Sequence, residues 1–145
     1  MRLNNQNIEW ELCKAYFSIL EINMSSEVSL EQLITTAKIS REEVEKKVPK
    51  NLKDYKIFFL KILISKLDKE VLDELKADIM HDTFSSTYDK ILEGLSLRFE
   101  KYLQYKKSFK ILSKNSKQRI EVFLNVFKEN SNFSSNLLTL IEEDQ

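Results

Sequence analysis

Apolar residues recur every three or four positions along most of this chain, which is the spacing of one face of an α-helix. These runs predict helices over the following stretches: 7–23, 52–80, 86–104, 105–113, 117–129 and 133–141. The stretch 105–113 either continues the helix before it or starts a new one. Polar residues predict loops at 81–86 and at 130–132. The pattern therefore predicts an all-α protein.

Residues 29–49 contain two helix-start signals eleven residues apart. Ser29 with Gln32, and Ser40 with Glu43, each have the spacing of a capping box. In a capping box the serine hydroxyl accepts a hydrogen bond from the backbone N–H three residues on, and that residue's side chain returns to the cap. The segment therefore predicts two short helices, over 29–37 and 41–48.

Only Lys38 and Ile39 separate the end of the first short helix from the cap of the second. So tight a connection makes the two helices cross steeply and share a small core. The expected core residues are Leu33, Ala37, Ile39 and Val44. This arrangement is typical of a helix-turn-helix, in which the second helix enters the major groove of DNA.

The same segment resembles the DNA-binding region of the TetR family of bacterial repressors. The sequence LITTAKIS resembles the family's second helix, and REEVEKKVP resembles its recognition helix and the proline that follows. The matching stretches are 33–40 and 41–49, with 8–22 as the first helix, 52 onward as the fourth, and 89–100 as a helix of the ligand domain. The likeness spans about residues 8–115.

The resemblance implies an N-terminal helix-turn-helix headpiece, residues 1–53, followed by a small helical ligand and dimerisation domain, residues 54–145. It also implies a ligand-responsive repressor that binds double-stranded operator DNA as a homodimer. A small apolar ligand in the helical core would release the DNA. The residues expected at the DNA are Ser40, Arg41, Glu42, Glu45, Lys46, Lys47, Lys50 and Lys53.

The segment departs from the family pattern at several positions. Lys38 replaces the family's turn glycine, Ile34 replaces a small residue, and Glu45 replaces a tyrosine that hydrogen-bonds a DNA phosphate. With Glu42 and Glu43, the short second helix carries three acids, and phosphate contacts dominate DNA affinity. The alternative is therefore a protein of this fold that has lost DNA binding and acts as a lipid- or protein-binding scaffold.

Composition changes this picture little. The 145 residues include 23 basic and 23 acidic ones, so the formal net charge is +0, which neither favours nor excludes DNA. Cys13 is the single cysteine, so no intramolecular disulfide is expected and a reduced compartment fits.

The N-terminus lacks the apolar core of a signal peptide. The longest apolar run, 57–64, is interrupted by Lys61 and too short to span a bilayer. These features predict a soluble cytoplasmic protein.

The residues of common catalytic sites are scarce. His81 is the only histidine, and with one cysteine and one glycine neither a metal cluster nor a glycine-rich phosphate loop is expected. We therefore expect no enzyme and no cofactor.

The stretch from Lys101 to Arg119 has seven basic residues and no acid, which indicates a solvated face or a second anionic contact. The apolar residues of 120–141 predict homodimerisation through that end.

Overall fold

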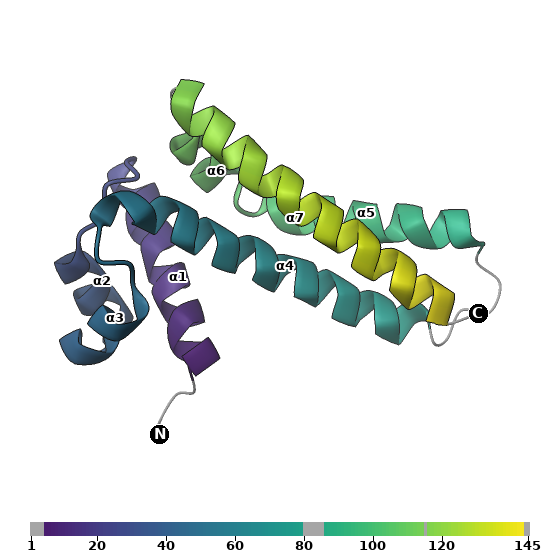
Figure 1. Ribbon diagram of the computed structural model, residues 1–145, viewed down its shortest axis with the longest axis horizontal. Helices are drawn as coiled ribbons and strands as arrows, with labels where there is room; N and C mark the ends of the chain where they lie inside the picture. The colour runs from purple at the N-terminus through teal and green to yellow at the C-terminus, as the bar shows by residue number, and fades with distance from the viewer. Residues whose placement is uncertain (1–4, 80–85, 115, 144–145) are drawn as a thin grey trace. The chain divides into compact units, whose positions relative to one another are not determined.

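The computed structural model describes residues 5–79, 86–114 and 116–143, and within these ranges the chain is helical with no strand. The helices are α1 (Asn5–Asn23), α2 (Leu30–Ala37), α3 (Arg41–Lys47), α4 (Tyr55–Ile79), α5 (Thr87–Leu103), α6 (Lys106–Leu112) and α7 (Ser116–Glu143) (Figure 1). One 3-10 turn, Leu52–Asp54, precedes α4. The prediction of an all-α fold is confirmed. Most of the loop predicted at 81–86, His81 included, lies outside the described residues.

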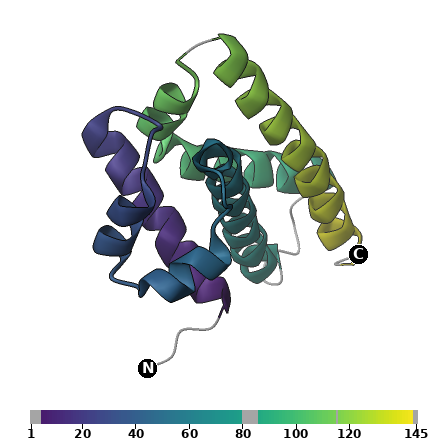
Figure 2. The ribbon, with the colours of Figure 1, turned by 60° about the vertical axis from the view of Figure 1, so that its left-hand side comes forward.

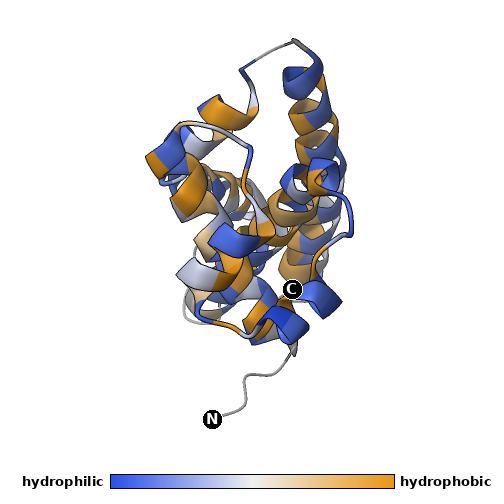
Figure 3. Cartoon of the chain, turned by 90° about the vertical axis from the view of Figure 1, so that its left-hand side faces the viewer, coloured by the Kyte–Doolittle hydropathy of each residue, from blue (hydrophilic) through white to orange (hydrophobic). Residues whose placement is uncertain are grey.

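The chain divides into two compact units. The first unit comprises Met1–Leu63 with Lys107–Phe123, and the second comprises Ile64–Lys106 with Leu124–Gln145. Helices α4 and α7 each contribute to both units. The expected headpiece, residues 1–53, falls within the first unit, where α2 and α3 lie beside α1 (Figure 2). Apolar and polar residues alternate along the helices, as an amphipathic pattern requires (Figure 3).

An aromatic cluster joins α1 to α4 in the first unit. The rings of Tyr16 and Phe59 stack with centroids 4.7 Å apart, and Phe17 meets the edge of Tyr16 at 5.2 Å. The ring of Tyr55 meets Phe59 edge-on at 5.9 Å, and the Cys13 thiol donates to the Phe59 carbonyl at 3.4 Å. All five side chains are almost fully buried. This cluster fixes the start of α4 against α1.

Burial in this cluster makes stability dependent on pH. It raises the pKa of the Cys13 thiol above its ordinary 9.0 and that of the Tyr16 hydroxyl above its ordinary 10.0. The unfolded chain then loses protons that the folded chain keeps, so a rising pH favours unfolding. We expect the free energy of unfolding, measured by urea titration, to fall as the pH rises through and above the ordinary thiol value of 9.0. Cys13→Ala should reduce the fall between pH 9 and 10, and equal stability at pH 8 and 10.5 would contradict the argument.

The core of the second unit lies between α4 and α7. Val71 and Leu75 of α4 pack with Phe133, Leu137 and Ile141 of α7, and all five are at most 2% exposed. Partly buried apolar side chains complete this core: Leu72, Ile91, Leu97 and Leu140. Two of these, Ile91 and Leu97, come from α5, so the unit is a three-helix packing.

Gly94 allows α5 to approach this core closely. A Cβ built at Gly94 would lie 3.0 Å from the Leu75 Cδ1 and 3.0 Å from the Leu137 Cδ1, which is closer than ordinary van der Waals contact. A glycine inside a helix costs about 1 kcal/mol relative to alanine. At Gly94 the missing side chain leaves room for Leu75 of α4 and Leu137 of α7 to pack against α5.

A buried ion pair lies next to this core. The guanidinium of Arg98 donates from Nε to Asp68 Oδ1 at 2.8 Å and from Nη2 to Asp68 Oδ2 at 3.1 Å. The Tyr102 hydroxyl accepts from Arg98 and donates to Asp68 Oδ1, each at 2.9 Å. Arg98 also donates to the Asn130 side chain and lies over the Phe133 ring, 4.7 Å from its centroid. Arg98 therefore contacts four side chains and links α5 to α4 and α7.

The predicted loop at 130–132 is wrong, because α7 runs without a break from Ser116 to Glu143. Asn and Ser are weak helix formers, and this composition suggested a loop. Tertiary contacts override that preference, since Asn130 accepts a hydrogen bond from Arg98 and Phe133 is buried one turn later. No Gly or Pro falls in this helix, so nothing in the backbone opposes its continuation.

Candidate nucleic-acid interface

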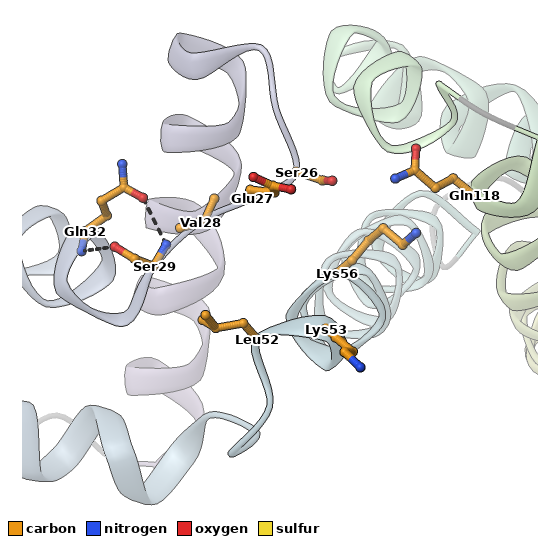
Figure 4. Close-up of a pocket in the computed structure, with 9 residues that line it drawn as sticks. All are labelled: Ser26, Glu27, Val28, Ser29, Gln32, Leu52, Lys53, Lys56 and Gln118. Atoms are coloured by element: carbon orange, nitrogen blue, oxygen red, sulfur yellow. Dashed lines mark hydrogen bonds between the residues drawn. The ribbon is translucent and has the colours of Figure 1, made fainter.

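Helix α2 starts at the capping box predicted from the sequence. The Ser29 Oγ accepts a hydrogen bond from the Gln32 N–H at 3.2 Å, and the Gln32 Oε1 accepts one from the Ser29 N–H at 2.9 Å. Both bonds are drawn in Figure 4. The cap satisfies backbone donors that the first turn of a helix leaves unpaired.

Helix α2 ends at Lys38, which adopts the left-handed conformation with φ 57° and ψ 39°. Its N–H donates to the Ile34 carbonyl at 3.0 Å and so caps the helix. A residue other than glycine pays roughly 1–2 kcal/mol for this conformation. Lys38 therefore makes a left-handed turn at the position where the resemblance predicts a glycine, and the prediction of two separate helices is confirmed.

Ser40 is the N-cap of α3, and its Oγ accepts a hydrogen bond from the Glu43 N–H at 3.3 Å. In this described segment the structure contains only that half of the second capping box, and the Glu43 side chain is exposed. Glu43 and Glu42 both lie in the first turn of α3, where the helix dipole favours negative charge. These two acids thus have a structural explanation that involves no ligand.

The shared core of α2 and α3 is smaller than predicted. Leu33 and Val44 are fully buried, whereas Ala37 and Ile39 are only partly buried. Ala37 is the last residue of α2 and Ile39 lies in the turn, so both border solvent at the tip of the helix pair. Val44 is therefore the side chain that anchors α3 in the first unit.

Two of the basic residues expected at DNA already contact acids of the protein. Arg41 forms an ion pair with Glu31 of α2, and its Nη1 lies 3.5 Å from the Glu45 Oε1. The Lys46 Nζ lies 3.6 Å from the Glu42 Oε1. Every side chain in these pairs is at least 52% exposed. Because exposed pairs contribute only about 0–1 kcal/mol, a phosphate group can compete for both basic side chains.

The remaining expected lysines continue from α3 toward α4. Lys47 is the last residue of α3 and is partly buried, while Lys50 and Lys53 are exposed in the connection that follows. The fully described segment from Lys38 to Lys53 contains six basic and three acidic residues, a formal charge of +3. The tip of the helix pair is therefore positive despite the acids of α3.

The negative charge of Glu45 acts on a buried tyrosine as well as on Arg41. Burial, followed by the negative charge of Glu45, raises the pKa of Tyr55, the first residue of α4. The side chain of Glu45 is still 53% exposed. At the position where the resemblance predicts a phosphate-binding tyrosine, this chain therefore has an acid whose charge acts on Arg41 and Tyr55.

A pocket of about 490 Å³ lies at the start of α2, next to the expected interface (Figure 4). Its lining residues are Ser26, Glu27, Val28, Ser29, Gln32, Leu52, Lys53, Lys56 and Gln118. The Lys56 Nζ lies 2.9 Å from the Glu121 Oε2 and lowers the pKa of that carboxyl group. The lysine, serine and glutamine side chains suit a small polar molecule better than the apolar ligand that the resemblance implies. No local sequence signal indicated this pocket, because its lining comes from separate parts of the chain.

Two lysines of the basic stretch from Lys101 to Arg119 bind acceptors within the protein. The Lys101 Nζ lies 2.6 Å from the Glu74 Oε1 and 3.5 Å from the Glu70 Oε2 in the second unit. Lys114 belongs to the first unit and donates to the Met24 carbonyl at 2.6 Å. Both lysines have acceptors within the protein, so the solvated-face interpretation explains part of this stretch.

Wider properties of the chain add little to this site. Among the described residues no cluster of His, Cys, Asp or Glu has the arrangement of a metal site. No described helix is both long and apolar enough to cross a membrane. Comparison with protein-family models, characterised proteins and solved structures gives no match to this chain, so the site is interpreted from its own residues.

Proposed function

We propose that α2 and α3 form a helix-turn-helix and that the protein is a TetR-like transcriptional regulator that binds operator DNA as a homodimer. The observation that supports this most is the pair of short, serine-capped helices separated by the left-handed turn at Lys38. The formal charge of +3 over Lys38 to Lys53 adds to it. A helix offered to the major groove needs such a tight turn and a positive tip. Release of the DNA by a small apolar ligand belongs to the same proposal.

The basic residues have distinct expected roles. Arg41 is at the start of α3, and an arginine fork can bind the O6 and N7 atoms of guanine in the major groove. Lys46, Lys47 and Lys50 are the expected phosphate contacts, with Lys53 at the edge. Binding requires Arg41 and Lys46 to exchange their exposed intramolecular acids for DNA. Since those pairs are weak in water, the exchange costs little.

A second candidate is a protein of this fold that does not bind DNA and acts as a lipid- or protein-binding scaffold. The ion pairs of Arg41 and Lys46 favour it, because they already neutralise the two basic residues. Glu45 in place of the phosphate-binding tyrosine favours it as well. The two candidates differ in whether the tip of α3 has any affinity for DNA.

Replacing Lys46 and Lys47 together with alanine is expected to weaken DNA binding and reduce its dependence on salt. Each lost phosphate contact should lower the slope of log affinity against log salt by about 0.9. The measurement is fluorescence anisotropy with pooled genomic fragments across a salt series. The matched control replaces Lys61 and Lys69, two exposed lysines of α4 outside both basic segments, and should leave affinity unchanged.

Glu45→Tyr should tighten binding, because it removes a repulsive charge and adds a hydroxyl that can donate to a phosphate. If the wild-type protein shows no salt-dependent binding at low salt, the regulator proposal fails. Weak binding that appears only in Glu45→Tyr would then support the scaffold candidate on the same fold.

A further inference from the structure

Helices α5 and α7 carry exposed stripes with the same residue spacing and opposite charge. In α5 an acid is followed by three exposed apolar residues at +3, +6 and +10 and a second acid at +11: Asp89, Leu92, Leu95, Phe99 and Glu100. In α7 a lysine is followed by three exposed apolar residues at the same offsets and a second lysine at +11: Lys117, Ile120, Phe123, Phe127 and Lys128. The six apolar side chains are 45–65% exposed.

The offsets put each set on one side of its helix. At 3.6 residues per turn, positions +3, +6 and +10 fall within a narrow arc, and positions 0 and +11 lie together along one edge of that arc. The charged residues at the two ends are about 16 Å apart along the axis in both helices. Exposed neighbours extend both apolar stripes: Tyr88 and Leu103 in α5, and Leu124 in α7. Each helix therefore exposes an apolar stripe with one charged edge: the edge is acidic on α5, and on α7 it is basic except for Glu121, which forms an ion pair with Lys56.

The charged edges of the two stripes determine which helix pairs are favourable. Pairing α5 antiparallel with a second α5 brings acids together, and pairing α7 antiparallel with a second α7 brings lysines together. Like charges across a helix interface disfavour such pairs. When two helices pack antiparallel, the same edges of their stripes meet, so α5 against α7 places acids opposite lysines. Contiguous exposed apolar patches commonly mark interaction sites.

We propose that the stripe of α5 binds the stripe of α7 of a second copy of this chain, antiparallel, with Glu100 opposite Lys117 and Asp89 opposite Lys128. Each copy has both stripes, so the contact is made twice in a symmetric dimer. Leu95 and Phe123 lie near the centre of each contact. The proposal rests on α5 and α7 alone and does not depend on the helix-turn-helix.

The first test exchanges charges, with the full chain studied by sedimentation over a range of concentrations. Asp89 also caps α5 through Ser86, so the test uses Glu100 and Lys117 instead. Glu100→Lys or Lys117→Glu alone should weaken self-association by roughly tenfold, since two exposed pairs become repulsive per dimer. The two together should restore it to near the wild-type value. A wild-type protein that stays monomeric at all concentrations, or a double variant weaker than both single ones, would overturn the proposal.

The second test uses engineered cysteines and identifies which helices meet. Cys13 is fully buried and burial raises the pKa of its thiol, so it does not compete in oxidation. When Leu95→Cys and Phe123→Cys proteins are mixed, disulfide-linked dimers that contain one copy of each variant should form quickly. Each variant on its own should form linked dimers several times more slowly. Faster linkage between like variants would contradict the pairing of α5 with α7.

Loss of association must also be separated from loss of folding. Leu95→Glu should abolish self-association, because it places a charge at the centre of the apolar contact. Ile22→Glu changes another exposed apolar residue, in α1, and should have no effect. Circular dichroism should show the wild-type helix content for both variants. Association that survives Leu95→Glu in a folded protein would show that the α5 stripe is not the interface.

Discussion

Replacing Arg98 with alanine is expected to lower the free energy of unfolding by about 3–5 kcal/mol, the range typical of breaking a buried ion pair. The side chains of Arg98 and Asp68 are each 10% exposed and share two hydrogen bonds. Without the guanidinium, the Asp68 carboxylate keeps only the Tyr102 hydroxyl as a described partner donor. The Phe133 ring also loses the cation above it. Urea unfolding monitored by circular dichroism measures the effect.

Two further variants test whether the cost comes from the unpaired carboxylate. Lys101→Ala, on the same helix as Arg98, removes two ion pairs to Glu70 and Glu74 of α4. These acids are 40% and 49% exposed, so the loss should be less than about 1 kcal/mol. Replacing Asp68 with leucine and Arg98 with methionine together should cost less than Arg98→Ala, because no buried charge is left unpaired. An Arg98→Ala loss no larger than that of Lys101→Ala would contradict the argument.

Replacing Leu137 with alanine is the second change with a large expected effect, roughly 3 kcal/mol of unfolding free energy. Leu137 is 2% exposed and packs with Leu75, Phe133 and Ile141. It also contacts the site of Gly94. The lost side chain leaves a cavity between three helices that can relax only partly. The change is measured by urea unfolding under the same conditions.

The neighbouring residue supplies a matched control for this substitution. Leu138 belongs to the same helix and is 46% exposed, so Leu138→Ala removes the same atoms with little loss of packing. We expect its cost to be below about 0.5 kcal/mol, as for most surface changes. Equal costs for the two substitutions would mean that α7 does not present this face to the core.

The sequence predicts the helices well where local signals suffice. Ser29, Ser40 and Ser86 each cap a helix at or next to the predicted start, because a cap depends only on residues within one turn. The prediction of a loop at 130–132 is wrong because the helix there depends on a contact with a distant residue. The hydrogen bond from Arg98 to Asn130 joins residues 32 positions apart, and no local pattern contains it.

The candidate site was predictable to a similar extent. The positions of Ser40, Arg41 and Lys46 on α3 follow from the cap and the helix length. The pairing of Arg41 with Glu31 crosses from α3 to α2, and the effect of Glu45 on Tyr55 crosses from α3 to α4. Both depend on how helices pack, so the sequence indicated which charges are present but not which of them compensate one another.

The division into two units affects the order in which the chain folds during its synthesis. The first unit needs Lys107–Phe123 in addition to Met1–Leu63, and the second needs Leu124–Gln145. Domains generally fold as they leave the ribosome, N-terminal parts first. Here the α2–α3 pair emerges early, yet the unit that holds it is incomplete until residue 123 has been added. Nascent chains therefore expose unfinished apolar surface for most of their translation, during which chaperones can bind it.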